Sequence, residues 1–331
     1  MLIPMMAHSR GSIISYTLFD EIMDDVKTEE ISFRDFSGIS FFLIFSVLFI
    51  SIYFYVSSYD LVGLFDSSIM HGDGGLTTAL LSIFRILCAY LAFHTAIFWM
   101  IKNPVPGKMN PLFREGSEIT EYNSLGFERL VPFSSWTLLI FGLTMLWNGF
   151  SSFWVFLCHT PSEIILHIGT AIFAAAFSSA VLTASIIRYV ILPNMVKREI
   201  EIDHMFLPHE QVMHNFALIL LSCEFVFGTM SIRLPMIALG LVYGACYLIF
   251  AELWARYGGG YYVYEFIDPR PSEGPFLLVG LTLVCAASFS FGLLISFLQD
   301  YNTIISNFLI LVLIILCTKF SAPADYEPNS T

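Results

Sequence analysis

One histidine and a pair of serines have the types and predicted depths that nucleophilic chemistry needs. His214 lies one helical turn inside the apolar segment 211–230, and no acidic residue is expected at its level on that helix. Ser134 and Ser135 lie at the start of another apolar segment, 132–157. A serine hydroxyl becomes an effective nucleophile when an adjacent imidazole accepts its proton. The ordinary alternatives are a satisfied core histidine and serines that cap a helix.

Eight apolar segments predict the elements that would position these side chains. The chain is 56% hydrophobic and 13% charged, whereas soluble domains carry about 25% charged residues. A helix needs about 20 apolar residues to cross about 30 Å of hydrocarbon, and continuous apolar runs favour helices over membrane strands. We therefore predict an all-α, polytopic transmembrane bundle with about eight spans: 39–58, 77–101, 132–157, 164–193, 211–230, 234–256, 276–298 and 302–319.

The bundle is predicted to occupy residues 38–319, between an acidic cytosolic N-terminal tail at 1–37 and a short polar C-terminal tail at 320–331. Small residues at four-residue spacing in segment 164–193 (Ala171, Ala175, Ser179 and Thr183) predict that this helix lies inside the bundle, because they allow close helix approach.

The Lys and Arg residues predict the orientation. If both termini are cytosolic, twelve of the 15 Lys and Arg residues fall on the cytosolic side, two lie within spans, and only Arg233 falls outside. Positive residues accumulate in cytoplasmic loops, so both termini are predicted to be cytosolic, with Ser134, Ser135 and His214 at one depth near that side. The net charge is −12 and no basic patch is present, which excludes nucleic acid as a partner.

Ionisable residues inside predicted spans suggest a function by default, because burying a charge in lipid is costly. Arg85 and Glu224 lie at matching depths near the outer side, so we predict a structural ion pair. Arg188 and Glu252 both lie near the cytosolic side and predict a second pair. His94 is a further intramembrane candidate without an assigned partner.

No motif predicts a metal or an organic cofactor. His209 and His214 are five residues apart, which would turn them about 140° apart on an α-helix, whereas the zinc-protease motif places two histidines four apart on one face. The six cysteines lie in or beside apolar runs and show no metal-binding spacing. The sequence does not indicate an oligomeric state.

Three blocks, which cover roughly residues 130–268, resemble the androgen-induced / rolling stone family of multipass membrane proteins. Phe133-Ser134-Ser135-Trp136-Thr137-Leu138 resembles the Thr-x-Trp-type start of a span in that family. Val212-Met213-His214-Asn215, with Glu224 ten residues later, resembles its Met-His block and following acid. Tyr247-Leu248-Ile249-Phe250, leading to Tyr262-Val263-Tyr264-Glu265-Phe266, is similar to its Trp-x-Tyr-Pro-Phe ending.

The resemblance implies a membrane-embedded hydrolase of lipid esters, the fatty acid esters of hydroxy fatty acids, that uses a threonine and a histidine. By position, His214 is the histidine and Ser134 replaces the threonine, retaining the β-hydroxyl; Glu265 replaces the family's proline. We therefore predict a Ser134–His214 dyad without a cofactor, with Asn215 and Ser135 as candidate oxyanion donors.

This hydrolase would act on a lipid ester drawn from the surrounding membrane lipid, in the endoplasmic reticulum or the plasma membrane. One alternative is a non-catalytic protein of rolling stone type that acts in cell fusion, adhesion or membrane organisation. A second alternative is a transporter that uses the buried charged residues as a relay.

Overall fold

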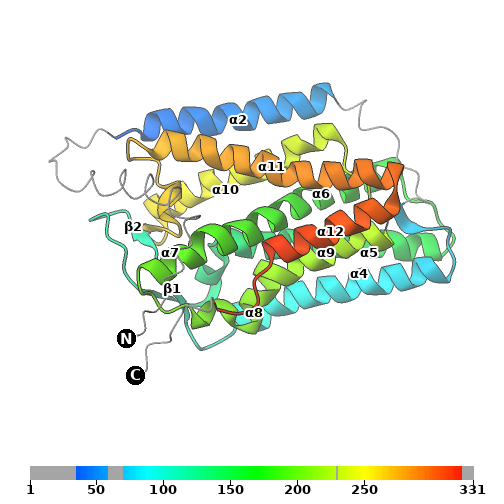
Figure 1. Ribbon diagram of the computed structural model, residues 1–331, viewed down its shortest axis with the longest axis horizontal. Coiled ribbons are helices and arrows are strands. Elements are labelled where there is room, and N and C mark those ends of the chain that lie inside the picture. The colour runs from blue at the N-terminus through cyan, green and yellow to red at the C-terminus, as the bar shows by residue number, and fades with distance from the viewer. Residues whose placement is uncertain (1–34, 59–69, 229, 323–331) are drawn as a thin grey trace, which may run out of the picture.

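The chain folds into an antiparallel bundle of helices with a small cap at one end (Figure 1). The computed structural model describes residues 35–58, 70–228 and 230–322. Most of the predicted N-terminal tail (1–34) and most of the predicted C-terminal tail (323–331) lie outside the described residues.

Helices follow the predicted apolar segments closely. The bundle consists of α2 (Ser37–Ser57), α4 (Leu76–His94) with the π-helix η3 (Thr95–Ile101), α5 (Phe133–Phe156), α6 (Glu163–Ile186) with the π-helix η5 (Ile187–Ile191) and α7 (Leu192–Lys197), α8 (Pro208–Gln211) with the π-helix η7 (Val212–Phe216) and α9 (Ala217–Phe227), α10 (Ile237–Tyr257), α11 (Gly274–Tyr301) and α12 (Thr303–Cys317). Short 3₁₀ segments complete the connections: η4 (Gly126–Leu130), η6 (Asp203–Phe206), η8 (Leu234–Met236) and η9 (Glu265–Ile267). The prediction of an all-α bundle is confirmed.

Within the described residues, six helical segments are long and apolar enough to cross a membrane: Ser37–Ser57, Leu76–Ile101, Phe133–Phe156, Glu163–Lys197, Leu234–Tyr257 and Gly274–Tyr301. The protein is therefore a multipass membrane protein. The other two predicted spans are helical but different. Helix α12 has 15 residues, about 22 Å at 1.5 Å per residue, and the run α8–η7–α9 carries several polar side chains.

The most enclosed helix is α6, as its small residues predict. It contacts α5, α9, α10, α11 and α12. In the helical segment Glu163–Lys197, which begins with α6, 72% of the most apolar 18-residue stretch is buried. A glycine on a neighbouring helix also allows close approach: a Cβ on Gly240 of α10 would lie only 2.9 Å from Ser178 Oγ of α6. By contrast, α2 lies at the edge of the bundle against α10 and α11 (Figure 1).

The polar run α8–η7–α9 is tolerated because the bundle surrounds it. Helix α9 contacts α5, α6 and α12, and Ala217, Leu218, Leu221 and Phe225 on it have no exposed surface. The polar side chains of the run, including His214, Asn215, Ser222 and Glu224, are buried as well, so they face protein instead of lipid.

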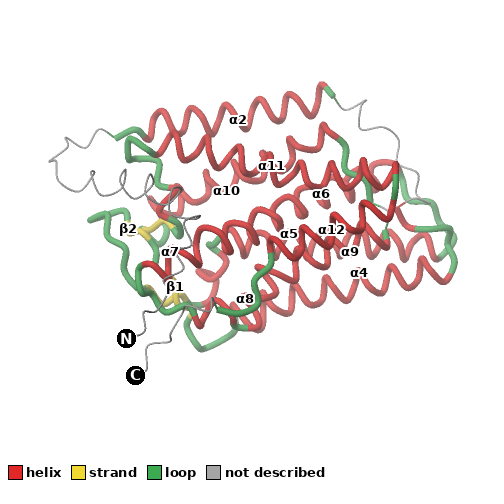
Figure 2. The backbone as a smooth tube through the Cα atoms, viewed as in Figure 1, coloured by secondary structure: helices red, strands yellow, loops and turns green. Residues whose placement is uncertain are grey.

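The cap holds the described strands, and Figure 2 shows them together at one end of the bundle. Strand β1 (Gly107–Met109) pairs antiparallel with β3 (Tyr122–Ser124), and β2 (Leu112–Phe113) pairs antiparallel with β4 (Tyr261–Tyr262). The second pairing fastens the loop before α5 to the loop after α10. These two loops cover the helix ends that the charge pattern predicts to be cytosolic, and we call this end the cap end.

Candidate active site

Two cavities of similar size open near the cap end, and Ser134 lines both. The polar cavity, of about 200 Å³, is lined by Ser134 together with His204, His209, Glu210 and His214. The apolar cavity, of about 210 Å³, lies among α2, α6, α10 and α11. Its walls are almost entirely aliphatic and aromatic, and include Ile44, Leu182, Tyr247, Leu248, Leu278 and Phe266.

The structure brings the two predicted catalytic residues to the wall of one cavity. Ser134 lies in the first turn of α5 and is 5% exposed. His214 lies in the π-helical turn η7 and is 4% exposed. Both line the polar cavity, as expected from their shared predicted depth. Their catalytic roles stay a prediction.

His214 does have an acidic neighbour on its own helix, so the expectation of none was wrong. Its Nε2 lies 3.4 Å from Oε2 of Glu210, one turn earlier, and the Glu210 side chain is 21% exposed. The spacing of four residues was visible in the sequence, but Glu210 fell just outside the predicted span. The Nδ1 atom of His214 is buried and has no hydrogen-bond partner. One ring nitrogen thus meets a carboxylate and the other is unpaired.

His209 and His214 do not face different directions, contrary to the expectation for an α-helix. His209 Nε2 lies 3.4 Å from Oε1 of the same Glu210, and both histidines line the polar cavity. Residues 212–216 form a π-helix, whose wider turn changes the angle between positions five apart, and such turns occur frequently at functional sites. Among the described residues, no group of three or more His, Cys, Asp or Glu side chains could hold a metal ion.

Arg129 links this cluster to the end of η3, a role that the sequence did not indicate. Its guanidinium donates to the carbonyls of Trp99 at 3.3 Å and Met100 at 3.0 Å, and it contacts His209 Nε2 at 3.4 Å. The segment η4, which precedes α5, is therefore tied to the end of η3 and to α8 through polar contacts at the cap end.

Neither side chain predicted as an oxyanion donor is available. Ser135 Oγ donates to the carbonyl of Arg129 at 2.7 Å. Asn215 Nδ2 donates to Gln211 Oε1 at 2.6 Å and to the Lys319 carbonyl at 2.7 Å, while its Oδ1 accepts from the Lys319 N–H at 3.0 Å. Asn215 thus fastens the end of the described chain to η7. The structure thus gives both donors other partners, a nearby carbonyl for Ser135 and the Gln211 side chain with the distant Lys319 carbonyl for Asn215, and does not support the expected oxyanion role of either.

Burial moves the pKa values of Tyr264 and His204, which line the polar cavity. The pKa of Tyr264, which lines both cavities, is raised to about 12 by burial of the phenol. The pKa of His204 is lowered from 6.5, chiefly by burial, which outweighs the attraction of Glu210. At neutral pH the polar cavity therefore contains a protonated phenol and a neutral His204.

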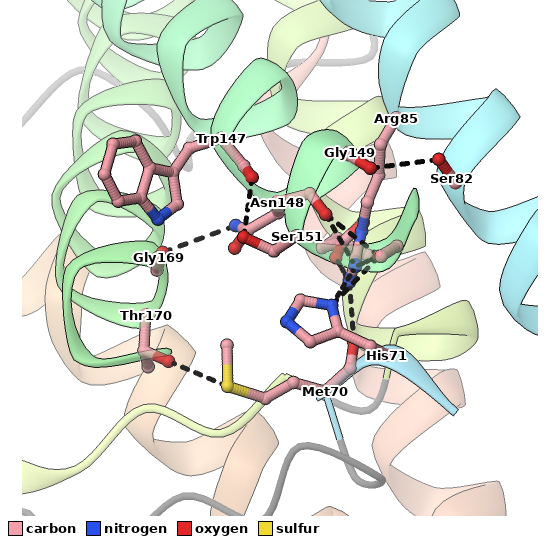
Figure 3. Close-up of polar contacts among 12 residues, drawn as sticks. Met70, His71, Ser82, Arg85, Trp147, Asn148, Gly149, Ser151, Gly169 and Thr170 are labelled. Atoms are coloured by element: carbon pink, nitrogen blue, oxygen red, sulfur yellow. Dashed lines mark hydrogen bonds and ion pairs between the residues drawn. The ribbon is translucent and has the colours of Figure 1, made fainter. Parts of the chain in front are cut away.

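The predicted ion pair between Arg85 and Glu224 is confirmed, at the end of the bundle far from the cap. Neither side chain has any exposed surface. Arg85 also donates to the Met70 carbonyl at 3.0 Å and lies 2.9 Å from Nδ1 of His71, while Asn148 approaches from α5 (Figure 3). These contacts provide acceptors for both terminal nitrogens of the guanidinium, whereas its Nε has no hydrogen-bond partner. The pair belongs to the bundle core and does not reach either cavity.

The predicted pair between Arg188 and Glu252 is wrong. Arg188 donates to the carbonyls of Ile315 at 2.6 Å and Thr318 at 2.5 Å, where it satisfies the last turn of α12. Glu252 pairs with Arg256 one turn later, and accepts a hydrogen bond from the Tyr262 hydroxyl at 2.5 Å. Equal depth in the membrane did not lead to pairing here, because Arg188 and Glu252 each have other partners close by.

His94, the remaining intramembrane candidate, lies among aromatic rings, with ring centroids 5.4 Å from Tyr90, 5.0 Å from Phe98 and 5.4 Å from Trp99. It lines neither cavity.

In comparisons with models of protein families, with curated proteins and with solved structures, no match to this chain was found. The resemblance to the androgen-induced / rolling stone family therefore remains an expectation, and the function is argued from the geometry of the two cavities.

Proposed function

We propose that the protein is an intramembrane hydrolase of lipid esters, with Ser134 as the nucleophile and His214 as the general base. The observation that carries the proposal is the position of Ser134 in the lining of both cavities. An ester of a fatty acid has an apolar chain on one side of its carbonyl and a polar reaction centre. A serine at the junction of an apolar and a polar chamber suits that division.

The contacts of His214 support its role. A general base needs one ring nitrogen with a free lone pair and benefits from a group that stabilises the imidazolium. Nδ1 is buried and unpaired, and Nε2 lies 3.4 Å from Glu210. The carboxylate favours the positive ring that forms when the serine proton is accepted, so we assign it a positioning role.

In the first step, the Ser134 proton moves to His214 Nδ1 while Oγ forms a bond to the ester carbonyl carbon. The π electrons of the carbonyl move onto its oxygen. When the carbonyl reforms, the bond to the alkoxy oxygen breaks and the leaving alcohol takes the proton from His214. Water then attacks the acyl-serine with the same help from His214, which releases the fatty acid and restores Ser134.

The apolar cavity supports a fatty acyl group as the part of the substrate that is bound. Residues of α2, including Ile44, line it on one side and residues of α11, including Leu278, line it on the other. Helices α2 and α11 contact each other at the edge of the bundle, so the apolar cavity lies close to the surrounding lipid. The resemblance to the family suggests an ester of a hydroxy fatty acid.

The test is labelling of the purified, detergent-solubilised protein with a fluorophosphonate probe, followed by hydrolysis of a fatty acid ester of a hydroxy fatty acid. We expect Ser134→Ala to abolish both reactions and His214→Gln to slow labelling by at least 100-fold, since general-base catalysis contributes about 10²–10⁴-fold. Ser151→Ala is the matched control, because Ser151 is a buried serine on the same helix whose hydroxyl donates to the Trp147 carbonyl at 2.9 Å.

Labelling that persists in Ser134→Ala would refute the assignment. A non-catalytic role in membrane organisation, cell fusion or adhesion would then be the better hypothesis. Loss of labelling in Ser151→Ala as well would show that the serine changes act through the fold, and would also refute the assignment.

A further inference from the structure

Among the described residues, three π-helical turns occur in the helices of the bundle, and all three line the polar cavity. The turn η3 contributes Met100, η5 contributes Val190, and η7 contributes Met213 and His214. Such widened turns are rare and occur frequently at functional sites. Both η5 and η7 are held by residues 315–320, at and just after the end of α12. We call this stretch the α12 strap, and Figure 1 shows it in red, running from α12 toward α8.

The α12 strap pairs with η7 directly after His214. Asn215 Nδ2 donates to the Lys319 carbonyl at 2.7 Å, and the Lys319 N–H donates to Asn215 Oδ1 at 3.0 Å. The side-chain amide therefore binds both polar groups of one backbone residue. The next pair of residues packs as well, since the rings of Phe216 and Phe320 have centroids 5.8 Å apart and planes inclined by 68°. Two consecutive residues of the five-residue turn are thus fastened to two consecutive residues of the strap.

The same strap is fastened to η5 through its carbonyl groups. Arg188 donates to the carbonyls of Ile315 at 2.6 Å and Thr318 at 2.5 Å, and the Tyr189 hydroxyl donates to the Leu316 carbonyl at 2.5 Å. The last carbonyls of a helix have no intrahelical donors, so the end of α12 offers these acceptors. The strap therefore bridges two π-helical turns that belong to the wall of one cavity.

This bridge bears on His214 because few contacts of its own fix the direction of the imidazole. Its Nε2 lies 3.4 Å from Glu210 on the same helical run, and among the described residues its buried Nδ1 has no hydrogen-bond partner. The α-helix is the ordinary conformation of such a segment, so contacts from outside the helix are needed to favour the wider turn. A return of η7 to α-helical geometry would change the direction of the His214 ring.

We propose that the α12 strap, through Asn215, positions His214 for catalysis by holding η7 in its π-helical turn. This inference rests on the hydrolase function proposed above. Asn215 is a positioning residue: it acts through the general base and takes no part in the bond-forming steps. The contacts of the strap with η5 hold that turn at a fixed place relative to η7, so the strap keeps this part of the cavity wall together.

The experiment compares Lys319→Pro with Lys319→Ala, because the contact uses backbone groups. Proline removes the N–H that Asn215 accepts, and Thr318 already has the extended conformation that a residue before proline prefers, with φ −85° and ψ 147°. Alanine keeps both backbone groups and should match the wild type. For Lys319→Pro we expect kcat of ester hydrolysis and the rate of fluorophosphonate labelling to fall by about 10- to 100-fold with little change in KM, since a displacement of about 1 Å can cost 100-fold.

The decisive measurement repeats the substitution in the His214→Gln background. A positioning residue has no effect once the group that it positions is gone, so Lys319→Pro should change the residual labelling rate by less than about threefold there. Equal slowing in both backgrounds would show that the strap acts through the fold and would overturn the proposal, while the hydrolase would stand. An unchanged kcat in Lys319→Pro, or an equal loss in Lys319→Ala, would overturn it too.

Asn215→Leu removes the same pairing from the side of η7 and keeps the approximate size of the side chain. It goes through the same comparison, and it replaces Lys319→Pro if that variant does not fold. Wild-type kcat in Asn215→Leu would also overturn the proposal. Labelling that persists in Ser134→Ala is a different outcome, because the hydrolase itself then fails.

Discussion

Replacement of Glu210 by glutamine tests whether the carboxylate beside His214 assists catalysis. The Oε2–Nε2 separation is 3.4 Å and the carboxylate side chain is 21% exposed. At an effective dielectric of about 20, unit charges at that separation attract by about 5 kcal/mol. Solvent at the partly exposed carboxylate screens part of this attraction, and we take about half, 2.5 kcal/mol, as the effective contribution. Each 1.36 kcal/mol is tenfold in rate, so kcat should fall by about 70-fold.

The assay is the steady-state hydrolysis of a fatty acid ester by the Glu210→Gln protein in detergent micelles, with thermal unfolding measured in parallel. Glutamine keeps the size of the side chain, so we expect KM to change little. Glu201→Gln is the control, since Glu201 is an exposed carboxylate of the same region that pairs with Lys108 at 2.6 Å. A Glu210→Gln enzyme with more than a third of the wild-type kcat would refute the electrostatic reasoning. An equal loss in Glu201→Gln would refute it too.

Two further predictions concern the bundle and the cap. Glu224→Gln should lower the free energy of unfolding by about 3–5 kcal/mol, because it leaves the charge of the fully buried Arg85 uncompensated. Adding Arg85→Met to this variant should restore at least about 1 kcal/mol, as measured by denaturation in detergent. A double variant whose loss of stability equals the sum of the two single losses would contradict this prediction. The pKa of His204 is lowered in the folded protein, so His204 takes up a proton more readily when the cap opens. The cap around His204 should therefore be fully stable above about pH 6.5 and become less stable as the pH falls toward the folded pKa. Hydrogen exchange of the segment 200–207 should therefore show more opening at about pH 5 than at pH 7.5, and His204→Gln should remove that difference; a difference that survives the substitution would exclude His204 as its cause.

The sequence predicted the helices well because lipid imposes one local rule, a long apolar run for each crossing. Runs such as 132–157 and 234–256 match α5 and α10 within a few residues. Matching depths near the outer side predicted the pair of Arg85 and Glu224 correctly. For Arg188 and Glu252 the depth argument failed, because Arg188 donates to the free carbonyls at the end of α12 and Glu252 meets Arg256 on its own helix and Tyr262 in the following loop.

For the candidate site, the sequence determined which residues share a level near the cap end: Ser134 at the start of one helix and His214 near the start of another. The tertiary structure decided what surrounds them. A π-helical turn brings His209 and Glu210 to the same cavity as His214, and a loop folded back from α10 brings Tyr264 to the two cavities that Ser134 lines. Neither follows from spacing along the chain, because the angle of a widened turn and the docking of a distant loop depend on contacts between segments that only the packed bundle creates.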